Sequence, residues 1–211
     1  MISKQSRDQR ERRDRLGILL SGRGSNFEAI ARNVREGKLD CEIGFVFANK
    51  PNAPGLARAR ELGLPCGSID SAGQERTAFD AQIAELLRQH QVDLICLAGY
   101  MRLLSGNFIR EFSGRILNIH PSLLPAFPGL DAQYQALSHG VKLAGCTVHF
   151  VDENLDSGPI LLQSAVPVLD GDTVETLSAR ILEQEHKIYS EAIAWVLAGN
   201  YRVDGRRVLR T

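Results

Sequence analysis

Short apolar runs alternate with longer amphipathic segments between residues 16 and 121, and this alternation constrains the fold more than any other feature of the chain. Residues 92–99, VDLICLAG, are almost continuously apolar. Such runs are typical of strands covered on both faces, which indicates a parallel sheet with helices between the strands. The expected strands are 16–21, 41–49, 64–70, 92–99 and 115–121, and the expected helices are 27–37, 55–63 and 75–90.

The pattern changes in the C-terminal third. Residues 146–168 hold two β-rich runs joined by an acidic loop with no room for a crossover helix, so these strands are expected to be antiparallel. The longest helical pattern, 172–200, opens with Asp172 and Glu175 at capping-box spacing and ends at a glycine. Residues 201–209 alternate around an Asp-Gly pair, which predicts a hairpin.

Together these segments predict an α/β fold, with a Rossmann-like, mostly parallel twisted sheet, helices on both faces and an antiparallel C-terminal part. The 211 residues, 44% apolar and 24% charged, fit one soluble domain with a substantial core, which we place at residues 16–211. Residues 1–15 carry six Lys or Arg against three Asp or Glu and are expected to form a basic, solvated tail.

Charge and cysteine usage exclude several classes of protein. The tail lacks an apolar core, so we expect neither a signal peptide nor a membrane span. The formal net charge is zero, which gives no basic surface that would indicate nucleic-acid binding. No two of the four cysteines form a C-x-x-C pair, and three lie beside apolar residues, so we expect free, largely buried thiols and a cytoplasmic protein. The four are Cys41, Cys66, Cys96 and Cys146.

The Gly-rich segment SGRGSN, residues 21–26, lies between the first strand and the first helix. A turn of this kind lets backbone N–H groups approach an anion, and the helix dipole adds to the attraction. The spacing matches neither a Walker A loop nor a complete G-x-G-x-x-G, which disfavours ATP and NAD. A phosphate site is therefore one interpretation. The alternative is a tight turn in which Ser25 or Asn26 caps the helix.

The strand at 115–121 ends in polar residues. In an extended chain Asn118 and His120 point to the same face, about 7 Å apart. Pro121 cannot donate to a ladder, so the strand stops there, and ligands are handled at the carboxyl ends of parallel strands. Farther along, Asp156 lies in an acidic loop and would approach His120 if the two strands were neighbours. The sequence does not show whether they are.

Four segments resemble the folate-dependent formyltransferases in order and spacing, over about residues 16–200. They are SGRGSN, AGYMRLLS, RILNIHPSLLPAFPG and GCTVHFVDENLDSGPI. The N-I-H-P-S-L-L-P motif and the later L-D-x-G-P are specific to formyltransferases and formyltetrahydrofolate hydrolases. G-S-N and the short length are similar to the branch that formylates glycinamide ribonucleotide.

The resemblance implies an enzyme that transfers the formyl group of 10-formyltetrahydrofolate to the primary amine of glycinamide ribonucleotide in purine synthesis. It implies a catalytic triad of Asn118, His120 and Asp156, and it needs no metal and no covalent nucleophile. The implied ribonucleotide residues are Gly24, Ser25 and Asn26 at the phosphate, and Glu185. The implied folate contacts are Arg76, Met101, Arg102, Leu103, Leu104, Asn118, Asp152, Glu153, Asn154, Leu155 and Asp156.

One departure from the family pattern concerns the residues after the Pro-Gly. Many family members carry His-x-His there, whereas this chain has Asp131 and Gln133. A histidine there can neighbour the catalytic carboxylate, so the local electrostatics and the pH optimum are in doubt, and the reaction class is not.

Three other functions remain to be weighed. Formyltetrahydrofolate hydrolase sends the formyl group to water, but normally carries an N-terminal regulatory domain that residues 1–15 cannot supply. Methionyl-tRNA formyltransferase needs a further C-terminal domain. A catalytically silent mononucleotide-binding module would tolerate the loss of Asp156. We expect only the two small-molecule substrates as partners, with no nucleic acid and no membrane; the oligomeric state stays open, and a homodimer is one alternative.

Overall fold

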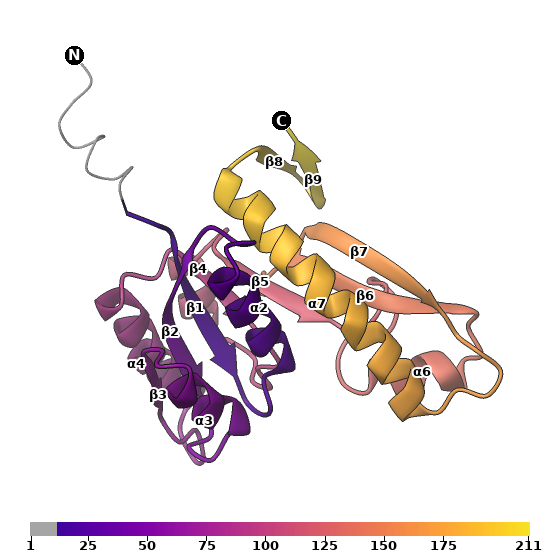
Figure 1. Ribbon diagram of the computed structural model, residues 1–211, viewed down its shortest axis with the longest axis horizontal. Coiled ribbons are helices and arrows are strands. Elements are labelled where there is room, and N and C mark those ends of the chain that lie inside the picture. The colour runs from indigo at the N-terminus through magenta and orange to yellow at the C-terminus, as the bar shows by residue number, and fades with distance from the viewer. Residues whose placement is uncertain (1–11) are drawn as a thin grey trace.

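Five parallel strands form the N-terminal half of one mixed sheet in the computed structural model, which describes residues 12–211 (Figure 1). They lie in the order β3-β2-β1-β4-β5, and each consecutive pair is parallel. The five predicted strands are therefore confirmed. Their bounds are β1 Arg15–Leu20, β2 Glu42–Ala48, β3 Cys66–Ser68, β4 Leu94–Leu97 and β5 Ile116–His120.

The C-terminal half of the sheet is largely antiparallel, as predicted. β6 runs antiparallel to β5, and β7 runs antiparallel to β6. β8 and β9 form the predicted hairpin, and β9 joins the sheet by a parallel pairing with β7. The bounds are β6 Leu143–Phe150, β7 Ile160–Pro167, β8 Tyr201–Asp204 and β9 Arg207–Arg210.

Helices cover both faces of the sheet. One core packs α2, α3 and α7 against one face, and the second packs α4 and α5 against the other. The long α7 crosses the sheet alongside α2, far from it in sequence (Figure 1). The bounds are α2 Ser25–Arg35, α3 Pro54–Glu61, α4 Arg76–Gln89, α5 Gly106–Glu111, α6 Ala132–Ser138 and α7 Val174–Ala198.

Two details of the helices differ from the sequence analysis. The six-residue α5 and the seven-residue α6 were not predicted, because they are too short to show a clear helical period. The capping box of α7 is formed by Thr173 and Thr176, so the predicted box of Asp172 and Glu175 is wrong by one residue. Asp172 instead forms a bidentate pair with Arg180, which holds the pKa of that carboxyl well below its usual range.

The N-terminal boundary also differs in detail. Arg15, expected in the tail, is the first residue of β1. Arg12 pairs with Asp93 at 2.7 Å and the Arg15 N–H donates to the same carboxylate at 2.8 Å, so both residues contact the loop before β4. The rest of the predicted tail, residues 1–11, lies outside the described residues.

Candidate active site

The polar end of β5 lies where the sheet changes from parallel to antiparallel, between β4 and β6. Leu117 and Ile119 pack into the core beneath α2 and α7, whereas Ile116 packs into the core of α4 and α5. Asn118 and His120 therefore share the Ile116 face, as the period of two predicts. His120 is buried, and Asn118 is partly buried.

The loop after β6 brings Asp156 to these two side chains. Its carboxylate lies 3.4 Å from His120 Nδ1 and 3.5 Å from the Asn118 amide nitrogen, and accepts the Gly129 N–H at 2.8 Å. The loop can turn back this tightly because Gly158 has no Cβ. A Cβ at this position would lie 1.9 Å from the Phe150 carbonyl oxygen. The three predicted triad residues thus meet in space, although far apart in sequence.

The contacts of His120 determine where its protons lie. Nε2 is 2.9 Å from the Phe127 carbonyl oxygen, which only accepts, so Nε2 carries a hydrogen and donates it. Nδ1 faces Asp156, and an ionised carboxylate also only accepts. The contact between Nδ1 and Asp156 is therefore favourable when a proton lies between them. The two side chains are therefore placed to share a proton.

His149 is a site residue that the sequence analysis missed. It is Asn118's register partner on β6 and is almost fully buried. Its Nδ1 donates to the Phe150 carbonyl at 2.8 Å, so Nε2 is left to accept from the Asn118 amide nitrogen at 3.2 Å. Burial lowers the pKa of His149, which keeps the ring neutral. A histidine near a strand end was the available signal, but its partner depends on the β5–β6 register.

The Gly-rich segment forms a bare helix N-terminus. Gly24 takes the N-cap position of α2 at φ +74°, a conformation that favours glycine, and no side chain caps the helix. The alternative in which Ser25 or Asn26 caps α2 is therefore wrong. The uncapped N–H groups point to the carboxyl edge of the sheet, where the triad also lies, and are suited to an anion.

Asn26 contacts a second predicted residue. Its amide nitrogen donates to the Glu185 carboxylate of α7 at 2.7 Å, and both side chains are buried. Burial raises the pKa of Glu185, and the hydrogen bond from Asn26 partly opposes that shift. The sequence analysis assigned both residues to the ribonucleotide but did not predict that they contact each other. The Asn26 amide oxygen is buried without a hydrogen-bond partner among residues 12–211.

The predicted folate residues form two groups, one in residues 101–104 and the other in the Asp156 loop and at the start of α4. Met101 and Leu103 are more than half exposed beside the site, and Arg102 lies over the Phe79 ring at 4.6 Å. Leu104 is buried in the core of α4 and α5, so its side chain serves packing. Apart from Asn118 and Asp156 of the triad, the remaining positions lie in the Asp156 loop and at the start of α4, and they are Asp152, Glu153, Asn154, Leu155 and Arg76.

Within the Asp156 loop, two predicted folate contacts already have protein partners. Glu153 pairs with Arg110 of α5 at 2.6 Å, and Asp152 accepts the Asn154 N–H at 2.9 Å. The two positions that depart from the family pattern lie at the start of α6. Asp131 is exposed and begins α6 at φ +56°, and Gln133 is partly buried in that helix.

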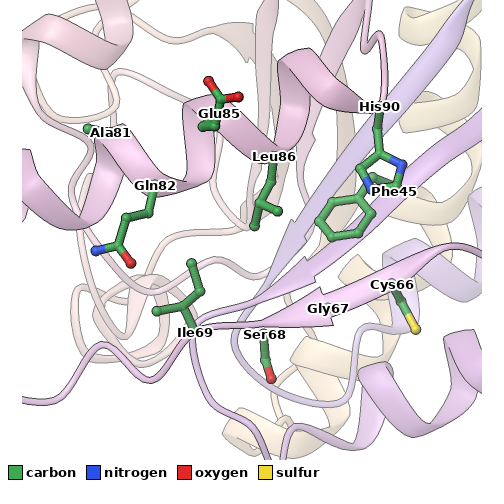
Figure 2. A pocket seen from close by; sticks show the side chains of 10 residues that line it. All are labelled: Phe45, Cys66, Gly67, Ser68, Ile69, Ala81, Gln82, Glu85, Leu86 and His90. Carbon is green, nitrogen blue, oxygen red and sulfur yellow. The ribbon is translucent and has the colours of Figure 1, made fainter.

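A hollow of about 700 Å³ lies elsewhere, between β3 and α4 (Figure 2). At one end of it the His90 ring stacks on Phe45 with centroids 4.1 Å apart. It shares no lining residue with the triad, whose convergent polar groups better mark a site of chemistry.

Within residues 12–211, no cluster of His, Cys, Asp or Glu is arranged to hold a metal, and no helix is long and apolar enough to cross a membrane.

Comparison with known proteins gives a consistent result. A family profile described as formyl transferase matches residues 14–193. Phosphoribosylglycinamide formyltransferase of Bacillus subtilis is 44% identical over 189 residues, 89% of this chain and 97% of that protein. The bovine trifunctional purine biosynthetic protein adenosine-3 is 47% identical over 90% of this chain, which spans only 19% of its length.

Solved structures agree in fold. Glycinamide ribonucleotide transformylase 1 of Symbiobacterium toebii superposes with a TM-score of 0.92 at 55% identity, over 94% of both chains. A formyltetrahydrofolate deformylase of Pseudomonas syringae gives a TM-score of 0.89 at 27% identity, over 94% of this chain and 66% of that one. The matched profile covers most of the chain, and the relatives match it at high identity. The chain therefore belongs to the formyl transferase family.

Proposed function

We propose that this chain transfers the formyl group of 10-formyltetrahydrofolate to the primary amine of glycinamide ribonucleotide, a step of purine biosynthesis. The observation that carries the proposal is the cluster of Asn118, His120 and Asp156 at the carboxyl edge of the sheet, which also holds the uncapped N-terminus of α2. A transferase for a phosphorylated amine needs both an anion site and a group that moves protons.

The reaction is an acyl transfer through a tetrahedral intermediate. The amine nitrogen attacks the formyl carbon, and the carbonyl oxygen becomes an alkoxide. The attacking nitrogen then loses a proton, folate N10 gains one, and the bond between the formyl carbon and N10 breaks. The products are the formylated ribonucleotide and tetrahydrofolate. The protein must therefore stabilise one oxyanion and carry one proton between two nitrogens.

Asn118 would stabilise the oxyanion. Its amide nitrogen is held toward the site by the His149 acceptor, and its contact with Asp156 is long, at 3.5 Å. One amide hydrogen can therefore turn to the developing alkoxide at little cost. Loss of one such donor typically slows turnover by about 10²- to 10³-fold.

His120 and Asp156 would move the proton. A proton shared by Nδ1 and Asp156 would lie on the same face as the Asn118 amide, where it would stabilise the alkoxide or reach the leaving nitrogen. Positioned acid–base groups of this kind contribute roughly 10²- to 10⁴-fold. Asp156 fixes the imidazole and stabilises its charged form. Asp156 is itself held by the Gly129 N–H.

The substrates would bind on opposite sides of this cluster. The phosphate would lie on the backbone of Gly24, Ser25 and Asn26, and the ribonucleotide would reach Glu185 of α7. The folate would contact the exposed loop that contains Met101 and Leu103, the Asp156 loop, and Arg76 and Arg102 with its glutamate carboxylates. We place this activity in a single domain, residues 16–211, that works in the cytoplasm without a metal.

A hydrolase is the alternative, because a deformylase shares the fold at lower identity. The bare N-terminus of α2 and the buried Asn26–Glu185 pair favour the transferase, since water as acceptor requires neither.

The test supplies 10-formyltetrahydrofolate with and without glycinamide ribonucleotide and follows tetrahydrofolate by absorbance and the formylated ribonucleotide by mass spectrometry. We expect release that depends on the amine and equals the formylated product. Release at the same rate without the amine would replace the transferase by the hydrolase.

A further inference from the structure

The loop between β4 and α5 has an exposed middle and buried anchors. Met101 and Leu103 expose 67% and 54% of their surface. At one end the Met101 N–H donates to the buried Ser21 hydroxyl at 2.8 Å, and at the other the Ser105 N–H donates to the carboxylate of Asp80 at 2.5 Å. We propose that Asp80 is a positioning residue that holds this loop in the shape that receives the folate, an inference that rests on the proposed function.

Asp80 reaches the loop from the first turns of α4. Arg76, Phe79 and Asp80 have the spacing i, i+3 and i+4, which places them on one face of the helix. Phe79 lies under the guanidinium of Arg102 at 4.6 Å, and Asp80 holds Ser105. Arg102 also donates to the Ser71 carbonyl at 3.3 Å. This face of α4 therefore supports the loop at two points.

The burial of the Asp80 carboxylate costs stability, and a side chain that only filled space would not need the charge. Asp80 is 1% exposed, and burial raises its pKa, opposed by the Ser105 hydrogen bond and the charges of Arg102 and Arg76. Its second carboxylate oxygen is buried without a hydrogen-bond partner among residues 12–211, and so is the nearby Tyr100 hydroxyl. An apolar side chain at position 80 would avoid this cost, so the carboxylate is explained by what it holds.

Asp80 should affect one substrate and spare the other. The proposed ribonucleotide residues lie on α2 and α7, which pack on the opposite face of the sheet from α4. Ser105 is also the N-cap of α5, so the bond from its N–H to Asp80 fixes where the loop enters α5. Without Asp80 the loop would sample more conformations, and the folate would have to order it on binding.

The experiment compares Asp80→Ala and Asp80→Asn with Glu85→Gln, an exposed carboxylate of the same helix. A hydrogen bond to a charged acceptor is worth about 1.5–3 kcal/mol, so Asp80→Ala should raise KM for 10-formyltetrahydrofolate about tenfold or more. KM for glycinamide ribonucleotide and kcat should stay within about twofold. Asp80→Asn should lie between, because its amide oxygen can still accept from Ser105, and Glu85→Gln should match the wild type.

Hydrogen exchange gives a readout that does not depend on activity. We expect faster amide exchange in residues 101–105 of Asp80→Ala, with the rest of the chain unchanged. Equal rises in both KM values, or unchanged exchange in this segment, would overturn the proposal. Faster exchange throughout both Asp80 variants would assign Asp80 to the core and also overturn it. If the wild type shows no amine-dependent transfer, the proposed function fails, and the exchange data still decide whether Asp80 holds the loop.

Discussion

At the scale of single residues, the site depends on which atoms carry hydrogen. The Phe127 and Phe150 carbonyls each fix one ring nitrogen as a donor, His120 Nε2 and His149 Nδ1. The remaining nitrogens then have opposite tasks, since Nδ1 of His120 faces a carboxylate and Nε2 of His149 faces an amide. Two backbone carbonyls thereby give two neighbouring histidines different roles.

The first prediction concerns Asp156. Asp156→Asn removes the charge that pairs with His120, so kcat should fall by about 10²- to 10⁴-fold. Binding of the ribonucleotide, measured by calorimetry, should be largely unchanged because its proposed phosphate site is on α2. The matched control is Asp170→Asn, whose carboxylate is almost fully exposed. Unchanged turnover in Asp156→Asn would remove this residue from the mechanism.

The second prediction concerns His149. His149→Leu removes the acceptor that orients the Asn118 amide, so kcat should fall by about tenfold or more while both KM values change little. His149→Gln offers a side-chain oxygen as acceptor and should recover part of the loss. His139→Gln, at an exposed histidine, serves as the control. Equal activity of His149→Leu and wild type would show that Asn118 needs no such support.

At the scale of elements, α2 and α7 meet through buried polar groups. Besides the Asn26–Glu185 contact, Asn33 of α2 donates to Ser190 of α7 at 2.8 Å. The helices are 159 and 157 residues apart at these contacts, so the loop that would bind phosphate is fixed by a helix from the other end of the chain.

The burial of Glu185 at this contact predicts that the stability of the protein depends on pH. The pKa of Glu185 is raised above 4.5 in the native state, so the native state takes up the proton more readily than the unfolded chain. The stability contribution of Glu185 is therefore present below pH 4.5 and is lost as the pH rises through the raised pKa. Glu185→Gln keeps an acceptor for Asn26 but does not titrate.

Urea unfolding at several pH values checks this expectation. As the pH rises from 4.5, the free energy of unfolding of Glu185→Gln should increase relative to that of the wild type. The variant should also have a higher KM for glycinamide ribonucleotide. If the stability difference between Glu185→Gln and the wild type does not change with pH, the pKa of Glu185 is not raised in the native state.

The elements themselves were largely predictable from local pattern. The strands and the four longer helices follow from apolar periodicity, because burial of one face needs only the side chains of that segment. The N-terminus of α7 was misplaced by one residue because Asp172, a plausible cap, is held by Arg180 instead. Local sequence shows that a cap exists, but a long-range partner decides which residue acts as one.

At the scale of the whole molecule, the junction of the parallel and antiparallel parts creates the site. β5 pairs in parallel with β4 and in antiparallel fashion with β6, so β6 ends beside the start of β5. The loop after β6 then folds back along β5, which brings Asp156 to Asn118 and His120. Tyr189 of α7 secures this junction, because its hydroxyl lies 3.0 Å from the Leu97 carbonyl and 3.1 Å from the Leu117 carbonyl.

Tyr189→Phe should therefore lower stability. Loss of this buried hydrogen bond costs about 0.5–1.5 kcal/mol, which lowers Tm by roughly 1–6 °C in a chain of this size. Tyr134→Phe, at a tyrosine that is 61% exposed, is the control and should leave Tm unchanged. Equal melting temperatures for the two variants would show that Tyr189 contributes through packing alone.

The sequence by itself determined the fold class and the chemical character of the site. Periodicity specifies strands and helices because it reflects local burial, and the pairing of Asn118 with His120 on one face follows from the period of a strand. The tertiary structure alone decided the neighbours. Asp156, His149 and Asp80 each contact a partner at least 25 residues away. Such contacts depend on strand register and on how helices pack across the sheet, and no local pattern encodes either.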